Sequence, residues 1–212
     1  MSTKKAITAL LSSLILVCGE AAAVSMGNLG FESGDTDGFA SQGNVSAVSE
    51  YSYTDDDGNA VVYKPTEGSY FAALSSAGSA MCGRFGGTNC SFLIGKNISL
   101  SAGNTLDFDW AFIGGDDDAD EHNDFALLLG VPGSQQLASI ESLGDGDDSG
   151  WQKFSWTADE DATLTVVWAA SNEGDYAGPS QLLLDNIRVV PEPASLALLG
   201  LGLLGMRLVR RK

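Results

Sequence analysis

Between residues 24 and 190, hydrophobic and polar side chains alternate over short stretches bounded by Gly, Asp, Asn and Ser. No long stretch has the 3.6-residue period of an amphipathic helix. Short alternating runs separated by turn residues are typical of antiparallel sheets. We therefore predict strands at 44–53, 60–64, 69–75, 91–99, 104–113, 124–130, 136–142, 151–157, 162–170 and 181–190. This pattern predicts an all-β fold, an antiparallel β-sandwich of the jelly-roll type.

The same alternation assigns side chains to the two faces of each strand. In 104–113 the acidic residues Asp107 and Asp109 share one face, and four hydrophobic residues share the other: Leu106, Phe108, Trp110 and Phe112. Equivalent patterns place Trp156 and Trp168 in the core together with Trp110. Sugar rings stack on exposed aromatic side chains, so the remaining candidates are those near loops or strand ends: Trp151, Tyr51, Tyr53 and Tyr176.

The first 23 residues have the features of a secretory signal peptide. Lys4 and Lys5 precede an apolar run from Ala6 to Val17, and residues 21–23 are the small Ala residues that signal peptidase prefers. We expect cleavage near Ala23, which leaves an N-terminal signal helix outside the mature protein. An uncleaved anchor helix and a lipoprotein signal at Cys18 are the alternatives. The apolar run is short for a span of about 30 Å.

Residues 24–190 carry a strong negative charge. They contain 26 acidic residues and five basic ones, a net charge of −21, and the basic residues are Lys64, Arg84, Lys96, Lys153 and Arg188. Such a surface repels nucleic acid and anionic lipid headgroups, so we exclude nucleic acid as a partner. It attracts divalent cations, although solubility alone is an equally good explanation of the charge.

Cysteine and histidine usage restricts the chemistry further. Cys18 lies in the signal peptide, which leaves Cys82 and Cys90 as a pair in an exported chain. Such a pair predicts a disulfide, worth about 2–3 kcal/mol in the chain-entropy model. His122 is the single histidine, which argues against zinc and against hydrolases that use a Ser-His or Cys-His pair. No nucleophile, nucleotide-binding or metal-hydrolase motif is present, so we expect no enzyme activity.

Three acidic segments, at 54–59, 114–124 and 144–150, resemble calcium-binding loops in composition. None has the full ligand spacing of a helix-loop-helix calcium loop, and Asp, Gly and Asn are also the residues that hairpin turns require. We therefore prefer a turn function for each segment taken singly.

Two separated segments, NLGFE at 28–32 and LLLDNIRVV at 182–190, suggest a different metal site. Alternation places Leu183, Ile187 and Val189 on one face with Asp185 among them, and it points Arg188 the other way. A carboxylate on an apolar face needs a partner or a metal. The segments resemble those of carbohydrate-binding and galactose-binding-like jelly rolls. That resemblance implies a structural calcium held by Glu32 and Asp185; an internal hydrogen-bonded aspartate or solvated edge residues are the alternatives.

The last part of the chain, residues 191–212, has three features in a fixed order. Pro191, Glu192 and Pro193 come first, a 13-residue apolar run from Ala194 to Met206 follows, and a basic cluster ends the chain with Arg207, Arg210, Arg211 and Lys212. Thirteen helical residues cover roughly 20 Å, which is short of a bilayer core. This order resembles the PEP-CTERM sorting signal of Gram-negative bacteria; an ordinary tail anchor is the alternative.

The PEP-CTERM resemblance implies recognition by an exosortase and transient insertion of a short C-terminal hydrophobic helix into the inner membrane. Cleavage and delivery to the cell surface or extracellular matrix follow. We therefore divide the chain into a signal peptide (1–23), a β-sandwich domain (24–190) and a sorting segment (191–212). The hypothesis is a non-enzymatic surface protein associated with exopolysaccharide or biofilm matrix, whose ligand-binding residues are unknown. A secreted glycan-active enzyme and a structural adhesin without a glycan site are the alternatives.

Overall fold

The computed structural model describes residues 29–80, 82–83, 86–115, 122–133, 135–143, 148–174 and 177–192. The predicted signal helix, the apolar tail, and the acidic stretches 116–121 and 144–147 lie outside these residues. Residues 26–190 form one compact unit. Among the described residues no helix has the length and apolar character needed to span a membrane.

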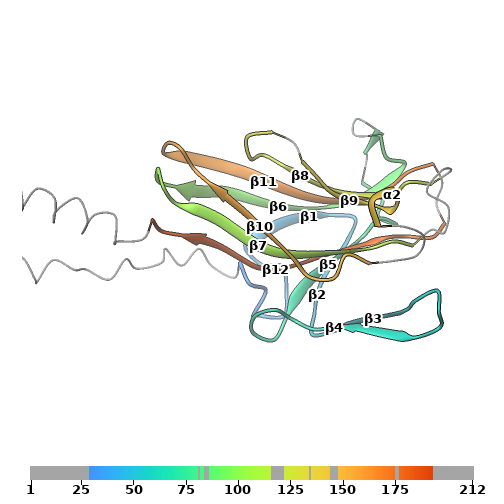
Figure 1. Ribbon diagram of the computed structural model, residues 1–212. Helices are drawn as coiled ribbons and strands as arrows, with labels where there is room; N and C mark the ends of the chain where they lie inside the picture. The colour runs from blue at the N-terminus through green and yellow to red at the C-terminus, as the bar shows by residue number, and fades with distance from the viewer. Residues whose placement is uncertain are drawn as a thin grey trace, which may run out of the picture. The chain divides into compact units, whose positions relative to one another are not determined.

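Two five-stranded antiparallel sheets make up this unit (Figure 1). The first sheet has the order β1-β6-β11-β8-β9, with β1 (Phe39–Gln42), β6 (Asn89–Leu100), β11 (Ala162–Asn172), β8 (Phe125–Leu129) and β9 (Gln135–Ser139). The second sheet has the order β10-β7-β12-β5-β2, with β10 (Gln152–Thr157), β7 (Thr105–Ile113), β12 (Gln181–Val190), β5 (Phe71–Ser75) and β2 (Asn44–Val48). The predicted antiparallel β-sandwich is confirmed.

The main core lies between the two sheets and follows the predicted alternation. Leu106, Phe108 and Phe112 of β7 are buried there, and the rings of Phe108 and Trp168 meet edge to face with centroids 5.5 Å apart. Trp168 is fully buried, as predicted, whereas Trp110 and Trp156 are half-buried and pack against the same core. Burial of these large apolar side chains is the main favourable contribution to folding.

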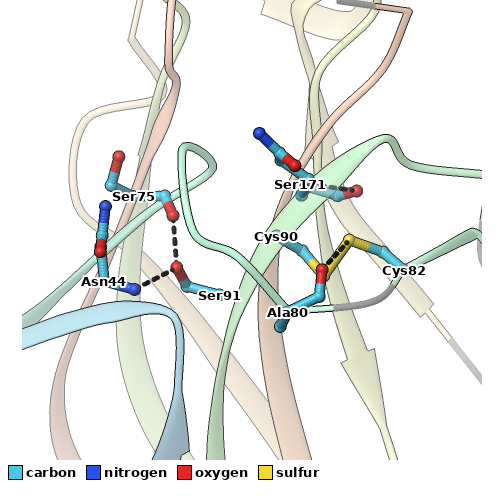
Figure 2. Close-up of a disulfide and its surroundings, with 8 residues drawn as sticks. Asn44, Ser75, Ala80, Cys82, Cys90, Ser91 and Ser171 are labelled. Carbon is cyan, nitrogen blue, oxygen red and sulfur yellow. Dashed lines mark hydrogen bonds between the residues drawn. A yellow bond between two sulfur atoms is a disulfide. The ribbon is translucent and has the colours of Figure 1, made fainter. Parts of the chain in front are cut away.

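Each sheet also carries a smaller apolar cluster on the face turned away from the core. On the first sheet this cluster surrounds the Cys82–Cys90 disulfide, which confirms the predicted pairing (Figure 2). Beside it, the Ser91 hydroxyl of β6 accepts a hydrogen bond from the Asn44 amide and donates one to the Ser75 carbonyl (2.8 and 2.6 Å). Ser91 therefore links the first sheet to strands β2 and β5 of the second.

A two-stranded hairpin, β3 (Tyr51–Thr54) and β4 (Ala60–Tyr63), accompanies the second sheet (Figure 1). Its turn contains one of the three acidic segments. There the Asp55 side chain accepts a hydrogen bond from the Asn59 amide (2.6 Å), and the Asp55 carbonyl accepts one from Gly58 (2.9 Å). Asp55 thus has the turn function that we preferred for this segment.

The strand prediction differs from the structure in three places. Strand β1 was missed because its four residues directly follow a Gly- and Asp-rich stretch. The predicted strand 44–53 is divided at 49–50 into β2 and β3, which belong to different sheets. The predicted strand 136–142 ends early in helix α2 (Ile140–Leu143). At this boundary the Ser142 hydroxyl accepts a hydrogen bond from the Ser139 amide and donates one to the Ser139 carbonyl, which stabilises the helical turn.

Candidate functional site

The face of the second sheet that is turned away from the core, here called the outer face, carries two chemically different regions. Near one end of β7, polar side chains from three neighbouring strands line a groove of about 180 Å³. We call it the charged groove and define it by Asp107, Asp109, Lys153, Ser155, Asn186 and Arg188. Cross-strand register brings these residues together, because Asp107 lies opposite Ser155 and Arg188, and Asp109 lies opposite Lys153.

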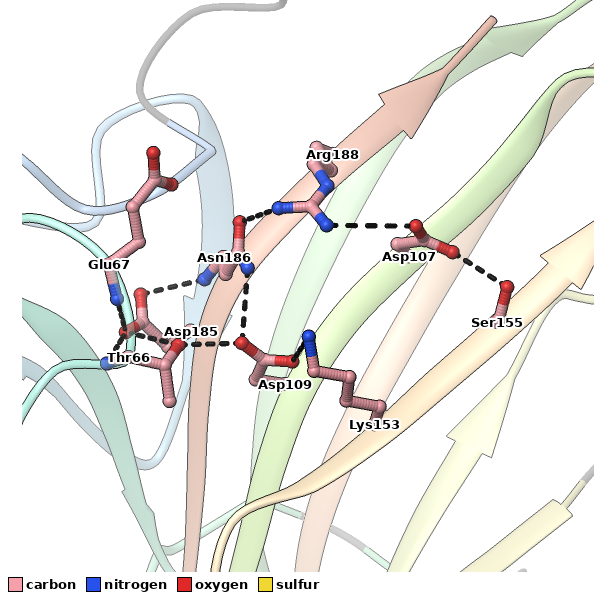
Figure 3. Close-up of polar contacts among 9 residues, drawn as sticks. All are labelled: Thr66, Glu67, Asp107, Asp109, Lys153, Ser155, Asp185, Asn186 and Arg188. Carbon is pink, nitrogen blue, oxygen red and sulfur yellow. Dashed lines mark hydrogen bonds and ion pairs between the residues drawn. The ribbon is translucent and has the colours of Figure 1, made fainter. Parts of the chain in front are cut away.

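Hydrogen bonds and ion pairs connect the side chains of the charged groove (Figure 3). The Ser155 hydroxyl donates to Asp107 (2.7 Å), and Arg188 Nη2 lies 3.8 Å from the other Asp107 oxygen. Lys153 Nζ lies 3.8 Å from Asp109 Oδ1, and the Asn186 amide donates to Asp109 Oδ2 (3.1 Å). Both cationic side chains remain accessible, with 78% of the Lys153 side chain and 48% of the Arg188 side chain exposed.

A β-bulge in β12 decides which face Arg188 occupies. The pairing of β12 with β7 shifts between Asp185 and Arg188, and Asn186 has a φ of +53° there. Leu183 and Asp185 therefore lie on the outer face, while Ile187 and Val189 turn to the main core. The prediction that Asp185 shares a face with Ile187 and Val189, and that Arg188 points away from it, was wrong. A bulge inserts one extra residue, and a shift of one residue reverses the faces of a strand.

Asp185 is fully buried beside the groove and holds a loop in place (Figure 3). Its Oδ2 accepts hydrogen bonds from the Thr66 amide (2.5 Å), the Thr66 hydroxyl (3.0 Å) and the Glu67 amide (3.1 Å). Its Oδ1 accepts one from the Asn186 amide (2.7 Å). Burial raises the pKa of Asp185, although these hydrogen bonds act in the opposite direction. Asp185 therefore anchors the loop that follows β4.

Glu32, the other predicted calcium ligand, contacts the same loop. Its carboxylate accepts a hydrogen bond from the Ser69 amide (2.8 Å). Gly68 permits this close approach, because a Cβ at that position would lie 2.2 Å from the Glu32 carboxylate oxygens. The preceding residue, Phe31, is fully buried with a φ of +62° and stacks on Phe39 at 5.2 Å. The early NLGFE segment is thus fixed in the core by its aromatic residue.

The two predicted calcium ligands therefore converge on the loop 66–69, Asp185 through Thr66 and Glu67, and Glu32 through Ser69. Both Asp185 oxygens already accept hydrogen bonds, mostly from N–H donors. Within the described ranges, no group of three or more His, Cys, Asp or Glu side chains is placed to hold a metal ion. This donor set suits an internally hydrogen-bonded aspartate, one of the two alternatives to a metal site, and calcium stays a prediction.

The other region of the outer face is apolar and is covered by the β3–β4 hairpin. We call it the covered cluster and define it by six buried residues: Tyr63, Phe71, Ala73, Ala111, Ile113 and Leu183. Trp151 packs on it, with its ring edge to face against Tyr63 and Phe71 at 5.7 and 5.6 Å. The Trp151 indole N–H donates to the Lys64 carbonyl (3.1 Å). Trp151 is therefore part of the packing that holds the hairpin.

Asp148 fastens the hairpin to the sandwich. It accepts hydrogen bonds from the hydroxyls of Tyr53 and Tyr63, the latter at 2.5 Å, and from the Gly150 amide (2.7 Å). Partial burial raises the pKa of Asp148, but these three hydrogen bonds together hold it below its usual value. Burial and the adjacent Asp148 carboxylate raise the pKa of Tyr63.

Sequence reasoning identified some of these residues and missed others. It placed Asp107 and Asp109 together on the polar face of one strand. It also named Trp151, Tyr51 and Tyr53 as aromatics left for sugar stacking, and the structure shows all three half-buried and packed on the covered cluster. It did not find the groove residues Lys153, Ser155 and Asn186. One signal was available, since Lys153 and Arg188 are two of only five basic residues between 24 and 190.

Of the sorting residues, Pro191 and Glu192 follow β12 directly, and Pro193, Arg207, Arg210 and Arg211 lie outside the described residues, as does Tyr176.

Several solved structures are similar to the sandwich. One is the carbohydrate-binding module TmCBM61 in complex with β-1,4-galactotriose, with a TM-score of 0.42 and 15% identity over 77% of this chain and 94% of that one. Another is a family 16 carbohydrate-binding module (TM-score 0.41, 16% identity, 78% and 98% covered). A third is the K1 cleaved adhesin domain of Lys-gingipain from Porphyromonas gingivalis (TM-score 0.39, 11% identity, 77% and 96% covered). These likenesses are too distant to assign a ligand.

No curated protein matches the chain. The PEP-CTERM protein-sorting motif matches residues 189–212, which include the Pro-Glu-Pro triplet, the apolar run and the basic cluster. This motif implies an exported protein that passes the membrane and is sorted to the surface with processing by an exosortase. The chain therefore carries a PEP-CTERM protein-sorting motif at residues 189–212, joined to an antiparallel β-sandwich.

Proposed function

We propose that this exported protein binds an extracellular saccharide of the exopolysaccharide or biofilm matrix in the charged groove, and that it does so without catalysing a reaction. The observation that carries the proposal is the groove itself. It brings hydrogen-bond donors and acceptors from three strands into one open depression, and its two cationic side chains are accessible.

The side chains of the groove have the chemistry that sugar hydroxyls require. Arg188 and Lys153 can donate hydrogen bonds, Asp107 can accept them, and Ser155 can do both, while the buried Asp109 holds Asn186 in place. Sheet register and the hydrogen bonds among these residues fix their positions before a ligand arrives, which reduces the entropy cost of binding. Rigid strands hold such a site more accurately than loops do.

The placement of positive charge supports the same site. Two of the five basic residues between 24 and 190, Lys153 and Arg188, face one groove in a region of net charge −21. Elsewhere on such an acidic surface an anionic polysaccharide is repelled. The groove has as many positive as negative side chains, so it repels an anionic saccharide less than the rest of the surface does.

A glycan array probed with the chain in mild detergent tests this function. We expect binding to at least one matrix-type polysaccharide, weakened about tenfold or more by Lys153→Ala and Arg188→Ala. Lys96→Ala is the matched control, since Lys96 is an exposed lysine on the first sheet and should leave binding unchanged. Silence across the array would favour a structural adhesin without a glycan site, and equal loss with Lys96→Ala would contradict binding in the charged groove.

The absence of catalysis is tested on the same polysaccharides. Asp107 and Asp109 form a carboxylate pair, and paired carboxylates are what glycoside hydrolysis requires. We expect no release of reducing ends by the wild-type protein. Measurable turnover that Asp109→Asn abolishes would contradict the proposal and favour a secreted glycan-active enzyme.

Sorting is tested in the producing cell. Replacing Pro191, Glu192 and Pro193 by alanines should block processing and surface delivery, because this triplet begins the sorting motif. Normal processing and delivery of that variant would refute the role of the triplet.

A structural calcium at Glu32 and Asp185 is a separate proposal. If calcium binds the folded state alone, its removal lowers stability, by about 2.7 kcal/mol where the free ion is at a hundred times its dissociation constant. Thermal melts with and without a chelator measure this, and an unchanged melting temperature would count against calcium.

A further inference from the structure

A second cavity, of about 300 Å³, lies on the far side of the covered cluster from the charged groove. The hairpin contributes Tyr51, Tyr53 and Thr54 to its lining, and the turn that follows contributes Asp56. The segment after β7 contributes Gly114, and the start of β12 contributes Gln181. We call it the hairpin cavity.

The two tyrosine rings of the hairpin cavity are fixed in position. Tyr51 and Tyr53 are two residues apart on β3, so they project from the same face of the strand. Both are half-buried and pack against the covered cluster, and the Tyr53 hydroxyl donates to Asp148. Burial raises the pKa of Tyr51 above its usual value, so its hydroxyl remains a hydrogen-bond donor. Two tyrosines that line the cavity are therefore held in place before a ligand arrives, which lowers the cost of ordering on binding.

The polar groups of this cavity differ from those of the charged groove. Of the described residues that line it, Asp56 is the only one charged at neutral pH, and it is an acceptor. A carboxylate in a region of net charge −21 repels anions and favours a ligand that presents hydroxyl donors. The Thr54 hydroxyl and the Gln181 amide add neutral polar groups. An uncharged ligand with several hydroxyls and one apolar face fits this lining.

We propose that the hairpin cavity is a second saccharide-binding site, specific for neutral sugars, whose ring face packs on Tyr51 and Tyr53 while a hydroxyl donates to Asp56. Its volume lies at the lower end for ligand pockets, which gives room for about one or two sugar rings. Asp109 and Ile113, which line the groove and the cavity respectively, are four residues apart on β7, about 14 Å. With the covered cluster between them, the two sites are separate, and this proposal does not depend on what the charged groove binds.

The test uses the full chain in mild detergent on an array of neutral and anionic oligosaccharides, followed by calorimetric titration with a neutral binder. Asp56→Asn and Tyr51→Ala should each weaken that binder about tenfold or more. Asp57→Asn is the matched control, since Asp57 is the exposed neighbour of Asp56 in the same turn and is not part of the lining. Tyr51→Phe keeps the ring and should retain most of the affinity.

A variant with both Lys153→Ala and Arg188→Ala separates this site from the charged groove. It should bind neutral oligosaccharides with unchanged affinity, whether or not the groove binds anything. The proposal is overturned if no neutral oligosaccharide binds, if Asp57→Asn weakens binding as much as Asp56→Asn, or if the groove variant abolishes neutral binding. If Tyr51→Ala strongly lowers the melting temperature, its loss of binding is not informative. The test then rests on Asp56→Asn, because Asp56 is exposed.

Discussion

The two regions of the outer face belong to the same strands of one sheet but have opposite surroundings. Strand β7 places Asp107 and Asp109 in the charged groove and, along the same face, Ala111 and Ile113 in the covered cluster. Strand β12 does the same with Arg188 and Leu183. The apolar half is closed by the hairpin, whereas the polar half stays open. One sheet face thus serves packing at one end and presents an open polar groove at the other, and the difference follows from the side chains together with the bulge in β12.

Each region also depends on one aspartate that holds a neighbouring segment. Asp185 fixes the loop 66–69 beside the groove, and Asp148 fixes the hairpin over the covered cluster. Asp185 is fully buried, while Asp148 is partly exposed. Removing the more buried carboxylate should therefore lower the free energy of unfolding by more, and this difference can be measured.

The largest effect is expected for Asp185→Ala. The variant removes the acceptor of three backbone amides, those of Thr66, Glu67 and the buried Asn186, from a fully buried position, so we expect a loss of about 3–4 kcal/mol in the free energy of unfolding. Denaturant unfolding measures it. Asp107→Ala, in the adjacent charged groove on the neighbouring strand, is the control and should cost less than about 1 kcal/mol. Equal losses for the two variants would contradict the anchoring role of Asp185.

A smaller effect is expected for Asp148→Ala. Loss of its hydrogen bonds from Tyr53 and Tyr63 should cost about 2–3 kcal/mol, because hydrogen bonds to a charged group are stronger than neutral ones. Hydrogen exchange should become faster in β3 and β4 and stay unchanged in β7. Asp57→Ala in the hairpin turn is the control. If exchange rises equally across the whole sandwich, Asp148 does not act on the hairpin specifically.

The two anchors should also respond to pH in opposite directions. The pKa of Asp148 is lowered in the folded state. Its ionisation therefore contributes to folding stability above the unfolded-state pKa of about 3.9, and this contribution is lost as the pH falls through the folded-state pKa. The pKa of Asp185 is raised in the folded state. Its protonated form therefore contributes to folding stability below the unfolded-state pKa of about 3.9, and this contribution is lost as the pH rises through the folded-state pKa.

Melting temperatures of the wild type, Asp148→Asn and Asp185→Asn across the acidic range test this difference. The difference in melting temperature between wild type and Asp148→Asn should increase from acidic to neutral pH. The corresponding difference for Asp185→Asn should decrease. Parallel changes in the two differences would show that the two carboxylates do not titrate differently.

The smallest effect on stability is expected for Lys153→Ala and Arg188→Ala. Both side chains are largely exposed, and their ion pairs with Asp109 and Asp107 are 3.8 Å long, so each variant should cost about 0–1 kcal/mol. The same variants should weaken saccharide binding strongly. A large loss of stability without a change in binding would show that the groove side chains serve packing. The charged groove would then not differ in role from the covered cluster.

Much of the sandwich could be predicted from local pattern. Alternation in β7 correctly separated Asp107 and Asp109 from the core residues Leu106, Phe108 and Phe112. Two cysteines in the exported region left one disulfide pairing. The order of the tail residues was enough to identify the sorting motif. Each of these follows from residues that are close in the sequence or few in number.

The candidate site was less predictable, because it depends on pairing between distant strands. Cross-strand register sets Asp109 opposite Lys153 and Asp185, which are 44 and 76 residues away. The bulge at Asn186 then turns Arg188 to the outer face, against the alternation of the segment. Local periodicity carries no information about register, and a single extra residue reverses every face beyond it.

The sequence by itself therefore determined most of the strands, most of their faces, the disulfide and the sorting motif, since these depend on side-chain period, cysteine number and a contiguous tail. The tertiary structure alone decided which polar residues meet in the charged groove. It also decided that Asp185 binds a loop and that the hairpin covers the apolar half of the outer face. Those outcomes require long-range strand pairing, whose free energy comes from burying surfaces that are far apart in the chain.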